Sequence, residues 1–351
     1  MGTENIRYAF LAEWYDEQAS LTRSYQLLFY PSDQVCEMFD LKSRRTFLRR
    51  TKMESLSLGQ LYIGAIVHIL SRQLKIIDYG DEFTLKKLGG IQFSCLLVGG
   101  DVLDNIPVIF AILAKKKLSL CKARTLSIDD KSADLICKHI PEASTLFKTN
   151  KIGNLLVVSV NVSQAVEKLS EVCGGLPGPV YLSDQDKAMR DIDVLFSGDN
   201  GQGKLALKST AKLGDGAVLA IVKPHAVTEG LAGPILQGIA DAGFKVRAVK
   251  LFFVDRRNAE EFFEVYRGVV SEYSGMVDQL CSGPCLALEV LASQQEFREL
   301  VGPADPEIGR HVRPYTLRAR FGTDKLKNAL HCTDLTEDAT IELEYFFKIL
   351  D

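Results

Sequence analysis

Asn328, His331 and Thr333 lie in one short segment near the C-terminus, in the pattern Asn-x-x-His-x-Thr-Asp. The segment brings an amide, an imidazole and a hydroxyl close together along the chain. A neutral imidazole is a nucleophile at physiological pH. His331 is therefore a candidate for a side chain that forms a covalent intermediate.

Three cations and a carboxylate in the same third of the chain suit that chemistry. Lys223 ends an apolar stretch, and Arg298 and Arg318 come from two further segments. Glu342 belongs to a C-terminal helical pattern, where a carboxylate could orient the imidazole. Transfer of a phosphoryl group through a covalent intermediate needs a nucleophile and cations that neutralise phosphate oxygens. The set indicates phosphoryl transfer at the histidine.

Two blocks of alternating strand and helix patterns would have to position these residues. In the last block, 215–351, strands are expected at 218–222, 245–254 and 285–290, and helices at 233–242, 258–267, 294–301 and before the C-terminus. In the preceding block, 91–200, strands are expected at 93–98, 118–128 and 154–160, and helices at 106–116, 131–139 and 163–172. Both orders predict an α/β (α+β) domain of the ferredoxin-like, split β-α-β kind.

The two blocks are interpreted as a duplication. Val98 aligns with Val222 and Phe196 with Phe321, at nearly the same offset of 124 to 125 residues. The Gly-rich stretch 198–216 between the blocks is typical of a linker. It also has the G-x-x-x-x-G-K spacing of a phosphate-binding loop, but Leu205 follows where such loops carry a hydroxyl, so the linker interpretation is favoured.

Residues 1–90 carry shorter runs with strand propensity. Strands are expected at 25–30, 35–39, 66–70 and 74–79, with a hairpin turn at Pro31-Ser32-Asp33. The pattern predicts a small β-rich N-terminal module.

The motifs of the last block resemble, in order, those of nucleoside diphosphate kinases. They are Val222-Lys223-Pro224, Ser282-Gly283-Pro284, Arg298-x-x-x-Gly302, Thr316-x-Arg318-x-x-Phe321-Gly322 and Asn328-x-x-His331-x-Thr333-Asp334. The resemblance implies that His331 takes the γ-phosphate of a nucleoside triphosphate, ATP or another, bound with Mg, and passes it to a diphosphate. It also implies nucleotide-binding roles for Lys223, Tyr266, Arg298, Arg318 and Asn328, and supporting roles beside the histidine for Thr333 and Glu342.

The last block also departs from that pattern. His225 stands where the family has aspartate, Ala304 where a threonine binds phosphate, and Cys332 where a glycine follows the histidine. The base-stacking loop is about two residues short, which leaves Tyr273 as a substitute, and three residues are added before Arg318. In the preceding block, a constant offset puts Gly99, Asp193, Gly203 and Ala206 at the positions of Lys223, Arg318, Asn328 and His331. We therefore expect a first copy without catalysis.

Residues 1–90 resemble the DM-ten module, which occurs mainly in proteins of ciliary axonemes. The resemblance rests on Glu13-Trp14-Tyr15-Asp16, the run 25–30, the basic stretch 44–52, Gly64 and the segment 78–83. One DM-ten module followed by two kinase-like domains is the order of axonemal members of the family. This order implies tubulin and other axonemal proteins as partners, and the axoneme of the cilium or flagellum, part of the cytoplasmic cytoskeleton, as location.

Two local features stay open between a functional and a structural reading. The basic stretch 44–52 could meet an acidic partner such as tubulin, or it could be a solvated hairpin face anchored by Phe47 and Leu48. Trp14 is interpreted as a core anchor rather than a ligand platform.

Composition excludes several other classes. The net charge of −3 argues against a nucleic-acid binder. The sequence contains no apolar run of eighteen residues, so no membrane span is predicted. The eight cysteines form no Cys-x-x-Cys pair and are not bracketed by histidines, so we expect reduced thiols in an intracellular compartment and no metal site. Two hypotheses remain: a structural component of the axoneme, as a protein of the doublet-microtubule lumen, or an active nucleoside diphosphate kinase.

Overall fold

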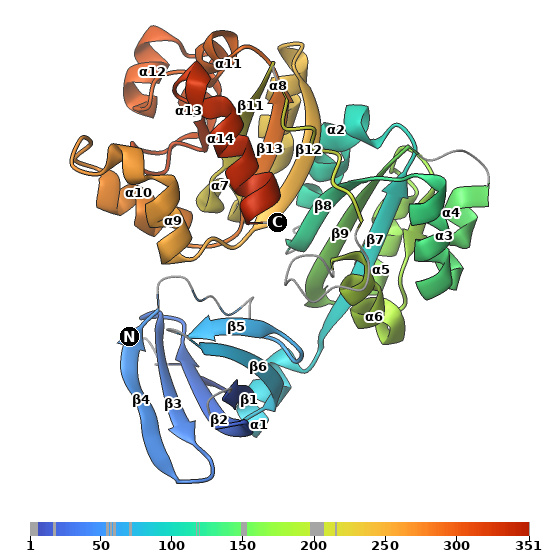
Figure 1. The fold of residues 1–351 in the computed structure, drawn as a ribbon, viewed down its shortest axis with the longest axis vertical. Coiled ribbons are helices and arrows are strands. Elements are labelled where there is room, and N and C mark those ends of the chain that lie inside the picture. Colours follow the sequence, from blue (N-terminus) through green and yellow to red (C-terminus); the bar gives the residue numbers. More distant parts are fainter. Residues whose placement is uncertain are drawn as a thin grey trace. The chain divides into compact units, whose positions relative to one another are not determined.

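The computed structural model describes residues 6–16, 19–53, 56, 58, 61–69, 72–116, 118, 120–148, 153–196, 207–214 and 216–350. The chain divides into two compact units, Met1–Ile91 and Gln92–Asp351, each drawn in Figure 1. No helix in the described part of the chain is long and apolar enough to span a bilayer.

The N-terminal unit is a six-stranded antiparallel sheet in the order β4-β3-β2-β1-β6-β5, followed by helix α1. Its elements are β1 (Tyr8–Asp16), β2 (Leu21–Tyr30), β3 (Val35–Asp40), β4 (Arg45–Lys52), β5 (Ile66–Ile69), β6 (Arg72–Tyr79) and α1 (Glu82–Leu88). Alternate residues of β2, namely Tyr25, Leu27 and Phe29, are buried in one core cluster, while Leu28 and Tyr30 are buried in a second cluster on the other face. The predicted β-rich N-terminal domain is confirmed, although β1 and β4 were not expected as strands.

Strand β4 contains most of the basic stretch and forms one edge of this sheet. Most of its side chains are exposed, but the Phe47 ring lies 4.8 Å from that of Tyr25. The Arg72 guanidinium of β6 lies 4.9 Å from the Phe47 ring and 4.9 Å from the Trp14 ring. The stretch is therefore an ordered edge strand held by aromatic contacts, with Arg45, Arg49 and Lys52 exposed.

The second unit is built on one eight-stranded sheet in the order β10-β7-β9-β8-β12-β13-β11-β14. Its first copy contains β7 (Ile91–Gly99), α2 (Val102–Lys115), β8 (Leu120–Ser127), α3 (Asp130–His139), η2 (Pro141–Ala143), α4 (Ser144–Lys148), β9 (Asn154–Ser163), α5 (Ala165–Cys173), β10 (Val180–Leu182) and α6 (Gln185–Leu195). The strand order 4-1-3-2 is that of a ferredoxin-like fold. The element order is the β-α-β-β-α-β order of that fold with α3, η2 and α4 inserted between β8 and β9.

The second copy repeats this arrangement with additional helices. It contains β11 (Ala217–Val222), α7 (Pro224–Thr228), α8 (Ala232–Asp241), β12 (Lys245–Phe252), α9 (Arg256–Phe262), η3 (Glu264–Tyr266), α10 (Tyr273–Leu280), β13 (Cys285–Leu291), α11 (Gln294–Val301), α12 (Pro306–Val312), α13 (Leu317–Phe321), β14 (Leu330–Cys332), η4 (Thr336–Asp338), α14 (Ala339–Glu344) and the π-helical turn η5 (Tyr345–Ile349). The predicted mixed α/β class and two ferredoxin-like copies are confirmed.

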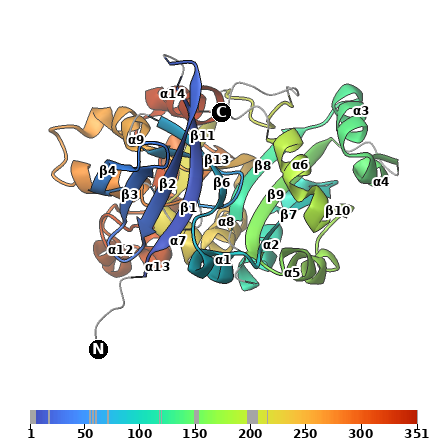
Figure 2. The same ribbon diagram turned by 90° about the horizontal axis from the view of Figure 1, so that it is seen from below.

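The two copies join through equivalent strands and helices. Strand β8 of the first copy pairs antiparallel with β12 of the second, with Arg124 opposite Lys250, and the Thr125 hydroxyl accepts a hydrogen bond from the Val249 amide at 3.0 Å. Helices α2 and α8 pack side by side on one face of the sheet, as both views show (Figures 1 and 2). Because each element meets its own counterpart, the copies are related by an approximate twofold axis.

The described part of the predicted linker, residues 207–214, is an ordered element. The Ser127 amide donates to the Lys208 carbonyl at 2.8 Å, and the Thr125 and Thr210 hydroxyls are 2.6 Å apart. Further along, the amides of Lys212 and Leu213 donate to the fully buried carboxylate of Glu289. These residues form no helix or strand, as expected of a linker, but they are hydrogen-bonded to both copies. Residues 197–206, including the phosphate-loop-like sequence, lie outside the described residues.

Candidate active site

His331 lies in the middle of the short strand β14, where it pairs with Ile221 of β11. It is only 6% exposed, and its ring contacts the edges of Phe262 and Phe263, with centroids 5.3 and 5.9 Å away. Antiparallel pairing with a fully buried strand fixes the backbone of the histidine, and the two aromatic rings restrict the imidazole.

Glu342, on α14, holds one ring nitrogen of this histidine. Its Oε1 atom lies 3.3 Å from His331 Nε2, and its Oε2 atom is buried with no hydrogen-bond partner among the described residues. A carboxylate accepts, so the neutral imidazole carries its proton on Nε2 and keeps the Nδ1 lone pair. The pair leaves Nδ1 as the nucleophilic atom.

Lys223 and Arg318 flank the same strand. The Lys223 amide donates to the Ala329 carbonyl at 2.9 Å, and Arg318 Nε donates to the Leu330 carbonyl at 3.0 Å. Burial, and next the Arg318 guanidinium, lowers the pKa of Lys223 to about 7. The main chain of Lys223 and the guanidinium of Arg318 therefore lie against the residues directly before His331, while the Lys223 side-chain nitrogen donates to the Leu326 carbonyl at 2.9 Å.

Asn328 and Thr333 lie on either side of the histidine but bind the backbone. Asn328 Nδ2 donates to the Ala304 carbonyl at 3.0 Å, and its Oδ1 atom is buried without a hydrogen-bond partner in the described chain. The Thr333 hydroxyl accepts from the Leu219 amide at 3.1 Å. Thr333 thus anchors β14 to β11, and none of its described hydrogen bonds reaches the imidazole.

Arg298 and Tyr266 meet at Asp334 rather than at the histidine. Arg298 Nη1 lies 2.7 Å from Asp334 Oδ1, and the Tyr266 hydroxyl donates to Asp334 Oδ2. Burial, together with this hydrogen bond, raises the pKa of Tyr266. These two predicted nucleotide-binding residues are therefore partnered with each other through one carboxylate.

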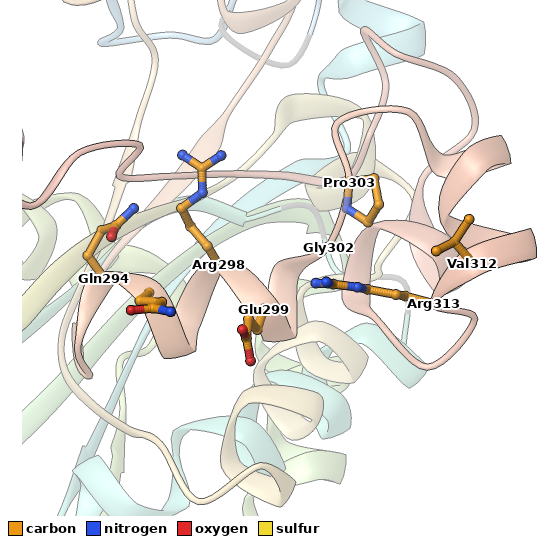
Figure 3. Close-up of a pocket in the computed structure, with 8 residues that line it drawn as sticks. Gln294, Arg298, Glu299, Gly302, Pro303, Val312 and Arg313 are labelled. Carbon is orange, nitrogen blue, oxygen red and sulfur yellow. The ribbon is translucent and has the colours of Figure 1, made fainter.

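A surface hollow of about 510 Å³ along α11 shares only Arg298 with this constellation. Figure 3 shows Gln294 and Arg298 projecting to one side of the helix and Glu299 to the other. The Gln294 amide also donates to the Asp334 carbonyl, so that side of α11 faces β14. The hollow is therefore peripheral to His331.

The first copy contains a counterpart of β14 that sequence reasoning missed. In strand β10, Tyr181 pairs with Leu97 as His331 pairs with Ile221. The Cys95 amide donates to the Ser183 hydroxyl at 2.7 Å, as the Leu219 amide does to Thr333. The register makes Tyr181 the counterpart of His331.

The carboxylate partner is replaced as well. The Tyr181 hydroxyl donates to Asp191 at 2.8 Å, in the place of the contact between His331 and Glu342. Arg190 binds the other oxygen of the fully buried Asp191 at 2.7 Å. A tyrosine–carboxylate–arginine network thus fills this end of the first copy.

This register corrects the expected counterparts of three site residues. Gly99 does correspond to Lys223, because the Gly99 amide donates to the Pro179 carbonyl as the Lys223 amide does to that of Ala329. The assignments of Asp193, Gly203 and Ala206, and the match of Phe196 with Phe321, are wrong. Val180 follows its partner Val98 by 82 residues, whereas Leu330 follows Val222 by 108. The first copy lacks the segment that forms α12 and α13, so a constant offset cannot hold as far as β10 and β14.

Two residues of the site had no predicted role. Asp334 ends the histidine motif, and its carboxylate joins Arg298 and Tyr266. His225 departs from the family pattern, and burial and the nearby Lys223 lower its pKa to about 4. Among the described residues, no group of three His, Cys, Asp or Glu side chains could hold a metal ion.

Comparison with known proteins agrees with this arrangement. Residues 2–90 match the model of the nucleoside diphosphate kinase 7 N-terminal PH domain, and residues 217–350 match that of nucleoside diphosphate kinase. The chain is 43% identical to nucleoside diphosphate kinase homolog 7 of Mus musculus over 377 aligned positions, covering 99% of this chain and 94% of the relative. The chain belongs to the nucleoside diphosphate kinase homolog 7 family. The Rattus norvegicus member of that family is 41% identical over the same shares of both chains.

Single-domain nucleoside diphosphate kinases are similar to part of the chain. The enzyme of Aquifex aeolicus is 39% identical over 135 residues, covering 38% of this chain and 94% of the relative. A crystal structure of that enzyme aligns with 37% identity over 38% of this chain and 94% of the crystallised one, with a TM-score of 0.36. The N-terminal unit is the β-rich domain that the homolog 7 family model describes as a PH domain.

Proposed function

We propose that the second copy is a nucleoside diphosphate kinase that works through a phosphohistidine at His331. The observation that carries the proposal is the environment of β14. Glu342 holds Nε2 of the imidazole, while the Lys223 main-chain amide and the Arg318 guanidinium bind the backbone of the residues just before it. A nucleophile whose Nδ1 has no hydrogen-bond partner among the described residues, in a segment bordered by a buried lysine and a buried arginine, suits transfer of a phosphoryl group.

The reaction would proceed in two half-reactions. His331 Nδ1 attacks the γ-phosphorus of a nucleoside triphosphate, the bond from that phosphorus to the β-phosphate oxygen breaks, and the diphosphate leaves with the electron pair. A second diphosphate then attacks the phosphorus through a β-phosphate oxygen, and the nitrogen–phosphorus bond breaks. Glu342 would stabilise the positive charge on the imidazole while it carries the phosphoryl group.

Mg would enter as part of the substrate, bound to ATP or another nucleoside triphosphate. Lys223, Arg298 and Arg318 would bind phosphate oxygens, Asn328 the ribose, and Tyr266 would flank the imidazole. Arg298 would exchange its contact with Asp334 for phosphate, because one guanidinium nitrogen is engaged there in the free protein.

The test is incubation of the full chain with γ-labelled ATP and Mg, followed by addition of a nucleoside diphosphate. We expect an acid-labile label on the protein that moves to the diphosphate. His331→Gln should abolish the label, whereas His311→Gln should not, since His311 is exposed on α12. A wild-type chain that acquires no label would contradict the proposal.

We propose as a second candidate that the chain is also a structural component of the ciliary axoneme, a doublet-microtubule inner protein that binds tubulin and other axonemal proteins. Two observations support it. The first copy retains its fold while a tyrosine–carboxylate pair stands where the second has histidine and glutamate. In addition, β4 exposes Arg45, Arg49 and Lys52 on a sheet edge, where an acidic surface could bind.

Co-sedimentation with microtubules tests this role. We expect the double variant Arg45→Glu with Arg49→Glu to weaken binding, and binding to fall as salt rises. Arg257→Glu is the matched control, because Arg257 is an exposed arginine in the second unit. Free release of the protein from axonemes at low salt would argue against a built-in component.

A further inference from the structure

Lys223 has a buried side-chain nitrogen with no carboxylate partner among the described residues. It is 6% exposed, and its Nζ donates to the Leu326 carbonyl at 2.9 Å. No carboxylate oxygen lies within 4.0 Å of Nζ in the described part of the chain. A buried charge with one neutral hydrogen-bond partner is poorly solvated, so the uncharged amine is favoured.

The charged groups around this lysine do not compensate. Arg318, on α13, adds a like charge, which opposes protonation, and Asp324 is the one carboxylate whose charge favours it. Asp324 accepts the amides of Leu326 and Lys327 at 2.8 and 2.7 Å, so much of its charge is already engaged. The balance of burial and charge holds the pKa of Lys223 at about 7.

His225, two residues on, contributes no charge to this balance. Its Nδ1 lies 3.1 Å from Nε2 of Gln279, a side chain that is 7% exposed, and its own Nε2 is buried without a hydrogen-bond partner among the described residues. Burial, Lys223 and Lys327 together lower the pKa of His225 to about 4, so the ring is neutral at pH 7. A neutral ring therefore stands two residues after the lysine, close enough for the charge of Lys223 to lower its pKa.

We propose that nucleotide binding at this site takes up a proton on Lys223, and that His225 is the positioning residue that leaves the lysine without a counter-charge until phosphate arrives. The inference rests on the proposed nucleotide-binding function. Phosphate oxygens beside Nζ favour the ammonium, so the lysine gains a proton from solvent as the nucleotide binds. No bond is made or broken apart from this nitrogen–hydrogen bond.

The sign of the pH dependence follows from linkage. A group whose pKa rises on binding contributes affinity that is fully present below its free pKa and is lost as pH rises above it. Because the pKa of Lys223 in the free protein is about 7, the Kd for Mg·ADP should increase about tenfold between pH 6 and pH 8. Phosphate groups of the nucleotide titrate in the same range, so a baseline is required.

Calorimetric titration of the full chain with Mg·ADP at pH 7, in buffers of different ionisation enthalpy, gives the number of protons taken up. Lys223→Arg supplies the baseline, because a guanidinium stays charged in both states. We expect the wild type to take up about half a proton more per nucleotide than this variant. Equal uptake by the two proteins would overturn the proposal while leaving nucleotide binding intact.

Two variants of His225 separate its role from simple packing. His225→Asp adds a carboxylate, so the extra uptake should fall to near zero and the Kd should change about twofold or less between pH 6 and pH 8. His225→Gln keeps the position neutral and should retain the wild-type uptake. Loss of uptake in both variants would remove His225 from the inference, and absence of Mg·ADP binding by the wild type would refute the proposed function and the inference together.

Discussion

His331 and Glu342 form a pair whose geometry assigns separate tasks to the two imidazole nitrogens. In the Glu342→Gln variant, the amide oxygen can still accept a hydrogen bond from Nε2 of His331. The neutral amide no longer offsets the positive charge of the phosphorylated ring. We expect formation of the phosphohistidine to slow by about 10- to 100-fold, the range seen when a group that orients a reactive ligand is replaced. Single-turnover labelling with γ-labelled ATP measures the rate.

Glu344→Gln is the control for that experiment. Glu344 belongs to the same helix, and its carboxylate binds the exposed Lys348 at 2.9 Å. The substitution should change the labelling rate by less than about twofold, because exposed pairs contribute little. Equal slowing in the two variants would assign the effect to α14 as a whole and not to the carboxylate on Nε2.

Individual site residues could be found from the sequence where their chemistry is carried by side-chain type and motif. His331, Lys223 and Arg318 belong to motifs, and the structure brings them to one strand. The contact partners could not be found in that way. Tyr266 reaches Arg298 only through Asp334, and this contact depends on how η3 packs against the residues after β14.

Among the elements, residues 207–214 and their anchor on β13 hold the two copies together. Glu289 is fully buried and receives hydrogen bonds from Arg247 at 2.9 Å and from the amides of Lys212 and Leu213. Glu289→Gln removes the charge while leaving Arg247 mostly buried. We expect a loss of about 3 kcal/mol in the free energy of unfolding of the second unit.

Urea unfolding of the full chain measures this loss by circular dichroism, since the single tryptophan, Trp14, belongs to the other unit. Glu171→Gln is the matched control, because Glu171 pairs with Lys116 at the surface, and it should cost less than about 0.5 kcal/mol. A Glu289→Gln chain as stable as the control would show that the ordered segment does not depend on this carboxylate.

Element prediction succeeded for long periodic segments and failed for short ones. Strands were expected at 25–30 and 245–254 and a helix at 294–301, and the structure has β2, β12 and α11 at these places. Strands β10 and β14 have three residues each, too few for a period to be visible, and their identity depends on pairing with β7 and β11. Because β10 was not predicted, the counterpart of His331 had to be taken from a constant sequence offset, and this offset gave the wrong residue.

For the second unit as a whole, the approximate twofold axis depends on close approach of α2 and α8. A Cβ atom on Gly233 would lie 2.6 Å from both Cα and N of Ala111, so a side chain there must push the helices apart. We expect Gly233→Val to lower the free energy of unfolding by about 1–3 kcal/mol through overpacking. Thermal unfolding of the full chain gives the measurement.

Gly174→Val is the comparison for this prediction. Gly174 has φ of −66°, and a Cβ there would meet no atom within 4 Å. The change should stay within about 0.5 kcal/mol. If both variants unfold at the wild-type temperature, α2 and α8 can move apart with no loss of stability. The close contact between Gly233 and Ala111 would then not be needed to join the two copies.

The segment that forms α12 and α13 exists in one copy and not in the other. Arg318 belongs to α13, and the Ala304 carbonyl that binds Asn328 lies just before α12, so the pseudo-symmetric partner has no material from which to build a matching nucleotide cradle. On the proposed function, we therefore expect Mg·ADP to saturate the chain at one equivalent, with a hyperbolic isotherm. The described part of the first copy offers no second nucleotide site through which binding could become cooperative.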